Sequence, residues 1–225
     1  MQPSNFLNSI IIAAIIFFGS TVYANEVESK FLDAGLVDVN RIDETIQVDL
    51  VNSDPAKNYF RENFYSGLKT AYLRKDIAVK LSKAQKALKN KHPDYSLLIL
   101  DAARPRNVSQ LMYDKMKGTK FEKFVANPQK GSMHNYGIAV DITLVDGFGD
   151  ELDMGFSPFR KSTLNLYWMF ARKKLGATLS TNQSSNRKLL ADVMVESGFI
   201  PLRFEWWHFN GMPKVDARKR YQIIE

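Results

Sequence analysis

Two short clusters of the chain contain residue types that bind catalytic metals. The first contains His134 and Asp141, and the second contains Glu205 and His208. The chain has no cysteine and only three histidines, so a metal would have to be held by His, Asp or Glu side chains. Two imidazoles and one carboxylate form a usual ligand set for catalytic zinc, which keeps a fourth coordination position open.

Glu205 is left over once His134, Asp141 and His208 are assigned as ligands. A carboxylate beside the metal can take a proton from water, because a bound metal lowers the pKa of that water toward about 7. The third histidine, His92, precedes a proline in a lysine-rich turn, and we expect it to be exposed and outside the site.

The spacing within each cluster constrains the backbone. His134 and Asp141 are an odd number of residues apart, as are Glu205 and His208, so a regular strand would point each pair to opposite faces. We expect Gly137 to supply a bend in the first cluster, and a bulge or strand end at the tryptophan pair in the second.

The two clusters also carry a family resemblance. Residues 132–141 match S-x-H-x-x-G-x-A-x-D, and residues 205–208 match E-x-W-H. The chain thereby resembles the zinc peptidase family that includes bacterial D-alanyl-D-alanine carboxypeptidases and dipeptidases. The E-W-W-H sequence and the D-A-A-R-P segment at residues 101–105 resemble its dipeptidase branch, the VanX type. The similarity extends over residues 58–209.

The resemblance implies a role for each matched position. His134, Asp141 and His208 would bind one zinc ion per chain, and Glu205 would be the catalytic base. Arg104 would lie beside the scissile carbonyl, where its fixed guanidinium donors can stabilise the oxyanion. The alternative for Arg104 is an ion pair with Asp101. Ser132 would hydrogen-bond the substrate, and its alternative is a loop-capping hydroxyl.

Two positions depart from the dipeptidase branch. Ala103 stands where the branch usually has an aromatic residue. Arg160 lies in a stretch where the branch tends to carry an aspartate suited to the free ammonium of the substrate. A cation there would oppose a free amine and favour an acidic or longer ligand.

The elements that must position these residues follow from periodicity and turn residues. We expect strands over residues 46–50, 97–100, 137–144 and 199–209, helices over 77–88, 108–116, 164–175 and 189–194, and a polar loop over 178–186. Without strict strand–helix alternation, they predict a single α+β domain. In the resembled family this is a central antiparallel sheet flanked by helices, with the zinc site at the sheet.

The first residues predict a targeting segment rather than part of the fold. Residues 10–18 are an uninterrupted apolar run, and Val22 and Ala24 suit a cleavage site. We therefore expect a signal peptide over residues 1–24, a catalytic domain over 25–225, and a periplasmic or secreted protein with no membrane span after cleavage. An uncleaved anchor is the alternative.

The expected activity is zinc-dependent hydrolysis of D-Ala-D-Ala by a dipeptidase acting on cell-wall precursor or turnover peptides. One alternative is a carboxypeptidase acting on longer peptidoglycan stem peptides, and another is a zinc-containing binding module without catalysis. The expected partner is a small D-amino-acid peptide, or peptidoglycan for the longer substrate. The formal net charge is +7, but no nucleic-acid motif accompanies it, and we expect no nucleic-acid partner.

Overall fold

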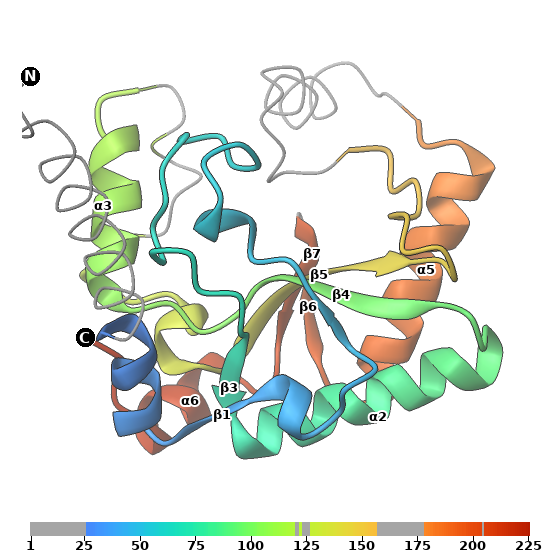
Figure 1. Cartoon of the computed structure of the whole chain (residues 1–225), viewed down its shortest axis with the longest axis horizontal. Coiled ribbons are helices and arrows are strands. Elements are labelled where there is room, and N and C mark those ends of the chain that lie inside the picture. The colour runs from blue at the N-terminus through green and yellow to red at the C-terminus, as the bar shows by residue number, and fades with distance from the viewer. Residues whose placement is uncertain (1–25, 120–121, 123–126, 157–177, 204) are drawn as a thin grey trace, which may run out of the picture.

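The computed structural model describes residues 26–119, 122, 127–156, 178–203 and 205–225. Its central sheet has five strands in the order β2-β4-β5-β7-β6 (Figure 1). These strands are β2 Gln47–Val48, β4 Ser96–Asp101, β5 Ala139–Val145, β6 Ile200–Leu202 and β7 Glu205–Asn210. All neighbouring pairs are antiparallel except β2 and β4, which are parallel. The predicted α+β fold with a mainly antiparallel central sheet is confirmed.

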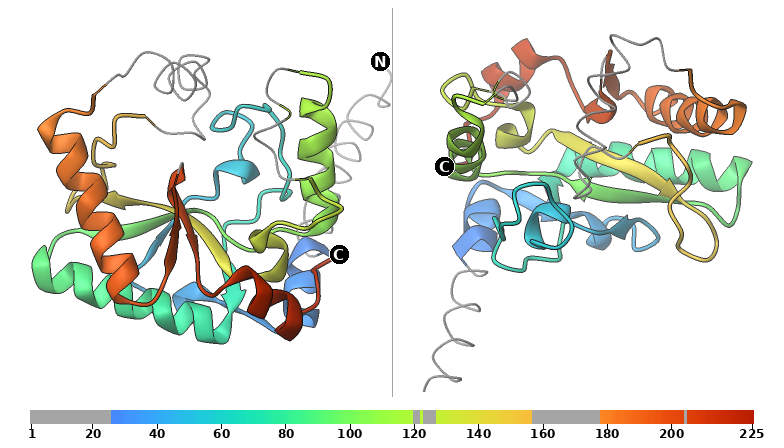
Figure 2. Two further views of the ribbon diagram at one scale, coloured as in Figure 1. Left: turned by 180° about the vertical axis from the view of Figure 1, so that it is seen from behind. Right: turned by 90° about the horizontal axis from the view of Figure 1, so that it is seen from above.

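Helices and a small second sheet surround these strands. The second sheet pairs β1 Leu36–Asp38 with β3 Tyr72–Arg74. Residues 26–33 are helical, followed by α2 Lys75–Lys91, α3 Arg106–Met116, α5 Thr181–Glu196 and α6 Lys214–Arg220. The 3₁₀ turns η1 Val39–Arg41, η2 Val51–Ser53 and η4 Met133–Tyr136 lie between these elements. Helices α2 and α5 pack against each other and against the sheet (Figure 2).

The main core lies between α2, α5 and one face of the sheet. The buried side chains of α2, including Ile77, Leu81 and Leu88, recur at the spacing that places them on one side of a helix. They join a cluster that contains Ile99 of β4 and Ile142 of β5. The hydrophobic effect of this burial holds the sheet against the two helices.

The opposite face of the sheet has a smaller apolar cluster of Val51, Leu98, Leu100 and Val145. Side chains alternate between the faces of a strand, so Asp141 points to the same face as Val145, away from α2 and α5. The strand pattern therefore places this carboxylate on the side of the sheet that does not carry the main core.

The predicted loop over residues 178–186 is wrong, because most of this segment is the first half of α5. The serine and asparagine residues of this segment favour a loop, but serine also begins helices. The Ser180 Oγ accepts a hydrogen bond from the Gln183 backbone N–H, and the Gln183 side chain accepts one from the Ser180 backbone N–H. This reciprocal capping box starts the helix.

Replacing Ser180 by alanine is expected to lower the free energy of unfolding by about 1 kcal/mol, because the cap is lost. The measurement is a urea unfolding curve. Ser185→Ala, at an exposed position of the same helix, is the matched control and should be neutral or slightly stabilising, since alanine favours helices. Equal unfolding midpoints for the two variants would contradict this role of the cap.

The predicted strand over residues 199–209 is also corrected, because it is a hairpin of β6 and β7 that turns at Arg203. Arginine is not a usual turn residue, so the reversal left no local signal. Pro201 has no backbone N–H and fits the edge position that β6 occupies. The register of the hairpin shifts between Pro201 and Leu202, which confirms the irregularity expected next to the tryptophan pair.

Other elements differ in length from those expected from the sequence, or were not predicted. The strand expected over residues 46–50 is only two residues long, because the chain turns into η2 at Val51. The short strands β1 and β3 and the helix α6 were not predicted. The helix expected over residues 164–175 lies outside the described residues, as does the segment 1–24. No helix within the described ranges is long and apolar enough to cross a membrane.

Candidate active site and metal centre

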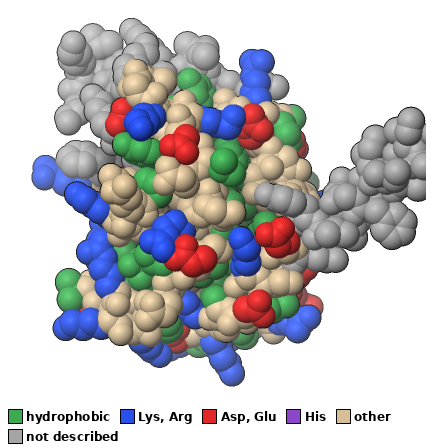
Figure 3. Space-filling view, turned by 90° about the vertical axis from the view of Figure 1, so that its left-hand side faces the viewer, with side chains coloured by type: hydrophobic (Ala, Val, Ile, Leu, Met, Phe, Trp, Pro, Cys, Tyr) green, Lys and Arg blue, Asp and Glu red, His purple; other side chains and the backbone are tan. Residues whose placement is uncertain are grey.

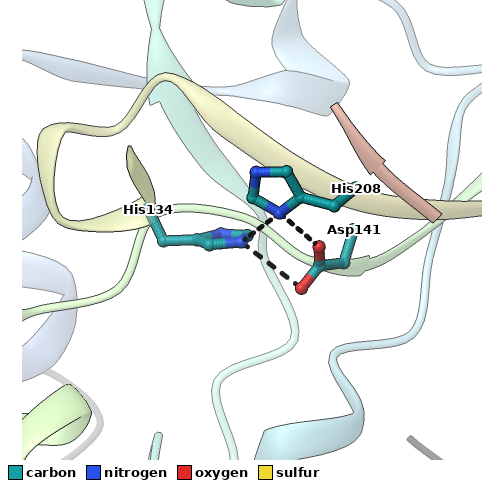
Figure 4. A group of neighbouring side chains, drawn as sticks. All are labelled: His134, Asp141 and His208. Atoms are coloured by element: carbon teal, nitrogen blue, oxygen red, sulfur yellow. Dashed lines mark hydrogen bonds and ion pairs between the residues drawn. The ribbon is translucent and has the colours of Figure 1, made fainter. Parts of the chain in front are cut away.

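The three predicted metal ligands meet on one face of the sheet (Figure 4). Asp141 of β5 lies directly opposite His208 of β7 in the antiparallel register, so their side chains project side by side. His134 comes from η4, which precedes β5. Gly137 ends this turn with φ at +69°, a conformation that favours glycine. The expected bend at Gly137 is confirmed, and His134 lies outside the strand.

The potential ligand atoms are close together. The His134 Nε2 lies 3.2 Å from the His208 Nδ1 and 3.3 Å from the Asp141 Oδ2. The His208 Nδ1 lies 2.9 Å from the Asp141 Oδ1. Ligands about 2.0–2.1 Å from a tetrahedral zinc lie about 3.3–3.4 Å apart. All three side chains are buried, and their donor types and separations fit one zinc ion.

The second nitrogen of each imidazole has a hydrogen-bond acceptor of its own. The His134 Nδ1 lies 2.6 Å from the Ala102 carbonyl oxygen, and the His208 Nε2 lies 3.0 Å from the Asn210 Oδ1. Each acceptor holds a proton on the nitrogen that it faces, which leaves the other nitrogen with a lone pair toward the centre. The sequence interpretation missed Asn210, although its position two residues after His208 on the same strand face is a signal for it.

The charges of this cluster act strongly on one another. Burial alone would raise the pKa of Asp141, but the charges and hydrogen bonds of His134 and His208 hold it well below its usual value. Burial alone would lower the pKa of His208, but the hydrogen bond and charge of Asp141 raise it above the ordinary value. An ionised carboxylate between two imidazoles attracts a cation to this position.

Glu205 lies at the start of β7 and is half-buried. Burial raises the pKa of its carboxyl, while the nearby charges of His208 and Asp141 act in opposite directions. Within the part of the chain that the structure describes, no side chain forms a hydrogen bond or an ion pair with this carboxylate. Glu205 is therefore a carboxylate near the ligand cluster that is free to accept a proton.

Arg104 follows β4, and its side chain is only 13% exposed. The Nε donates to the Asp101 Oδ2 at 3.1 Å and to the Tyr65 hydroxyl at 3.3 Å, and the Nη2 also pairs with Asp101. Burial would lower the pKa of Arg104, but Asp101, Tyr65 and Asp141 raise it above its usual value. The ion pair with Asp101 that was the alternative for Arg104 is present. The charge of Asp141 also contributes to the raised pKa of Arg104, so the two side chains lie close enough to interact electrostatically.

The carboxylate of Asp101 is completely buried and accepts several hydrogen bonds. Besides Arg104, the Tyr65 hydroxyl donates to it at 2.7 Å, the Asn52 Nδ2 at 3.0 Å and the Ala102 backbone N–H at 3.0 Å. Such a saturated carboxylate fixes the near edge of the guanidinium. The sequence interpretation did not identify Tyr65 and Asn52, which lie far from Asp101 in the chain.

Ser132 caps η4. Its Oγ accepts a hydrogen bond from the His134 backbone N–H at 3.2 Å, as its alternative interpretation expected, and its contact with substrate stays a prediction. His92 is exposed and its ring stacks on Tyr95, so its predicted exclusion from the site is confirmed. Arg160 lies outside the described residues.

Known proteins resemble this chain over most of its length. The peptidase M15 family model, described as D-ala-D-ala dipeptidase, matches residues 33–224. A D-alanyl-D-alanine dipeptidase of Synechocystis is 26% identical over 180 residues, which are 65% of this chain and 71% of that protein. A D-alanyl-D-alanine dipeptidase of Escherichia coli is 29% identical over 116 residues, which are 51% of this chain and 54% of that protein.

Two solved structures are also similar. The LdcB LD-carboxypeptidase is 17% identical with a TM-score of 0.36, over 66% of this chain and 63% of its own. VanYB in complex with D-alanine-D-alanine is 18% identical with a TM-score of 0.38, over 66% of this chain and 76% of its own. The family model alone spans far more than half of the sequence, and this chain therefore belongs to the D-ala-D-ala dipeptidase family of M15 peptidases.

Proposed function

We propose that this peptidase is a zinc-dependent D-alanyl-D-alanine dipeptidase that acts on cell-wall precursor or turnover peptides. The observation that carries the proposal is the buried cluster of His134, Asp141 and His208, in which the second nitrogen of each imidazole faces a hydrogen-bond acceptor. Glu205 lies near this cluster, and no side chain among the described residues pairs with it. This arrangement suits hydrolysis of a peptide bond by water, and membership of the family favours the D-Ala-D-Ala bond.

Glu205 and Arg104 divide the chemistry between them. Zinc, when bound by the three ligands, would polarise the scissile carbonyl and lower the pKa of the attacking water. Glu205 takes a proton from that water as it adds to the carbonyl carbon, and it returns a proton to the leaving amine as the C–N bond breaks. The Arg104 guanidinium stabilises the negative charge that develops on the carbonyl oxygen.

The electrostatics of the site support these roles. Asp101 and Tyr65 occupy the Nε and Nη2 side of the guanidinium. No described residue hydrogen-bonds the Nη1, which can therefore donate to an oxyanion. A donor group held in advance stabilises developing charge without having to reorganise. Ser132 completes the proposal as a substrate hydrogen-bond partner at the start of the turn that carries His134.

The deciding experiment incubates the zinc-loaded protein with free D-Ala-D-Ala and, separately, with a stem pentapeptide. Release of two alanines from the dipeptide supports a dipeptidase. Release of only the terminal alanine from the pentapeptide, with the dipeptide untouched, would replace the proposal by a carboxypeptidase. If neither peptide is cleaved, the binding-module alternative holds.

Arg160 gives a sequence-based prediction on substrate choice. We expect a lower KM for an N-acylated dipeptide than for free D-Ala-D-Ala, because a guanidinium opposes the free ammonium. Arg160→Asp should shift the preference toward the free amine, and added salt should reduce the difference. The measurement is the ratio of the two kcat/KM values. An unchanged ratio would leave Asp153 or Glu151 as the carboxylate that receives the ammonium.

We also propose that the chain is exported and that residues 1–24 are removed. The basis is the apolar run before Ala24. Sequencing the N-terminus of the protein from a periplasmic or secreted fraction tests the proposal. A start at Met1, or retention in the cytoplasm, would contradict it.

The surface charge agrees with the proposal that no nucleic acid binds this protein. On the face drawn in Figure 3, lysine and arginine side chains are interspersed with acidic ones rather than gathered in a stripe.

A further inference from the structure

We propose that Asn135 is a positioning residue that ties Arg104 to the turn carrying His134, and so sets the place of the guanidinium relative to the metal ligands. The inference rests on the proposed role of Arg104 at the oxyanion. Asn135 stands at a position that the S-x-H-x-x-G-x-A-x-D pattern leaves open, so the pattern itself assigns it no role.

The amide of Asn135 is completely buried and fully hydrogen-bonded. Its Oδ1 accepts a hydrogen bond from the Ser132 backbone N–H at 2.8 Å. Its Nδ2 donates to the Arg104 carbonyl oxygen at 2.8 Å and to the Ser109 Oγ at 2.9 Å. One side chain thus joins the turn η4, the residue that carries the guanidinium and the first turns of α3. A buried amide with all these partners has one favoured orientation.

Three hydrogen bonds connect the segment before α3 with η4. The Arg104 backbone N–H donates to the His134 carbonyl oxygen at 3.1 Å, and the Arg104 carbonyl oxygen accepts from Asn135. The third is the contact between the His134 ring and the Ala102 carbonyl oxygen. Both backbone polar groups of Arg104 are therefore held by the turn that supplies the first metal ligand.

The C-terminal residues support Asn135 from the other side. The Ile224 backbone N–H donates to the Asn135 carbonyl oxygen at 2.8 Å, and the Arg106 backbone N–H donates to the Ile224 carbonyl oxygen at 2.8 Å. Ile224 itself is buried in the main core. The Asn135 backbone is thus fixed by the core, which lets its side chain act as a rigid link.

This link matters because, in the described structure, the backbone groups of Arg104 bond to η4 rather than to a strand. Asp101 fixes the guanidinium relative to β4, whereas Asn135, together with the His134 carbonyl, fixes the Arg104 backbone relative to η4. Without the hydrogen bond from Asn135, the guanidinium N–H groups of Arg104 could shift relative to the reacting carbonyl. A displacement of about 1 Å in an active site can reduce the rate about 10²-fold.

The test compares Asn135→Asp with wild type, each loaded with zinc, on the peptide that wild type cleaves. Aspartate keeps the size of the side chain and the acceptor for Ser132, but it replaces the donor to Arg104 by an oxygen. We expect kcat to fall about 10²-fold, with little change in KM and about one zinc per chain retained, since the oxyanion contact belongs to the transition state. If this variant does not fold, Asn135→Ser carries the same expectation.

Asn40→Asp is the matched control. Asn40 also uses its Nδ2 to bond a backbone carbonyl, that of Ile46 at 2.7 Å, but it lies in η1, outside the site. We expect nearly normal kcat in this control. A fall in kcat equal to that of Asn135→Asp would mean that general destabilisation, rather than positioning of Arg104, explains the effect.

A double-mutant cycle separates this inference from the proposed function. Arg104→Ala should be strongly impaired, and adding Asn135→Asp to it should cost little more, because the group to be positioned is already absent. Independent, multiplying losses, or loss of zinc in parallel with kcat, would overturn the role of Asn135 alone. Normal activity of Arg104→Ala would instead overturn the oxyanion role on which the inference rests.

Discussion

Glu205→Ala is expected to keep its fold and its zinc and to lose at least about 10²–10⁴-fold in turnover, the usual contribution of a positioned proton-transfer group. The three ligands do not depend on Glu205 for any hydrogen bond within the described chain, so its removal should leave them in place. The measurements are kcat with the cleavable peptide and zinc content by elemental analysis. Near-normal turnover would show that another group is the base.

The matched control is Glu196→Ala. Glu196 is an exposed glutamate at the end of α5 that pairs with Lys91. Its removal should leave turnover unchanged, because surface ion pairs contribute little to stability.

Arg104→Lys offers a further contrast within the site. We expect it to impair turnover as well, since a lysine point charge cannot both pair with Asp101 and present the donors of a guanidinium.

His208→Ala is expected to lose most of the bound zinc, and His134→Ala and Asp141→Ala are expected to do the same. Each removes one of three ligands from a site that would hold about one zinc per chain. Elemental analysis after dialysis gives the metal content. Zinc should also raise the unfolding temperature of wild type, because a ligand that binds only the folded state stabilises it.

His92→Ala is the control for this series, because His92 is exposed and its ring stacks on Tyr95, away from the predicted ligands. It should bind as much zinc as wild type and respond equally to added metal. Equal zinc content in His208→Ala and wild type would overturn the ligand assignment, whatever the activity of either protein.

Residue types limited the possible ligands, and the family resemblance selected among them. A chain with no cysteine and three histidines has few ways to build a zinc site, and the two matched patterns contain His134 and His208 but not His92. The main helices and strands were also predictable, because the apolar positions of α2 recur at the helical period and β4 contains a short continuous apolar run, which is typical of a buried strand. The start of α5 was missed because serine favours both loops and helix caps.

Tertiary structure decided how those residues are held. The acceptor of His134 is a carbonyl at Ala102, and that of His208 is Asn210. The pairing of His134 with Ala102 follows from no local pattern, whereas Asn210 lies two residues after His208 on the same face of the strand. The sequence also left open whether Arg104 pairs with Asp101 or faces the site. The folded chain allows both, because Asp101 takes one edge of a guanidinium that has donors on its other edge.

The sequence by itself determined which chemistry this protein can support, because imidazole and carboxylate groups keep their ligand character wherever they lie. Only the tertiary structure decided that Asp141 and His208 are cross-strand neighbours, and that η4 brings His134 to them and Asn135 to Arg104. These contacts join residues tens of positions apart. They depend on strand register and chain reversal, which are set by the packing of the whole core rather than by any local run of residues.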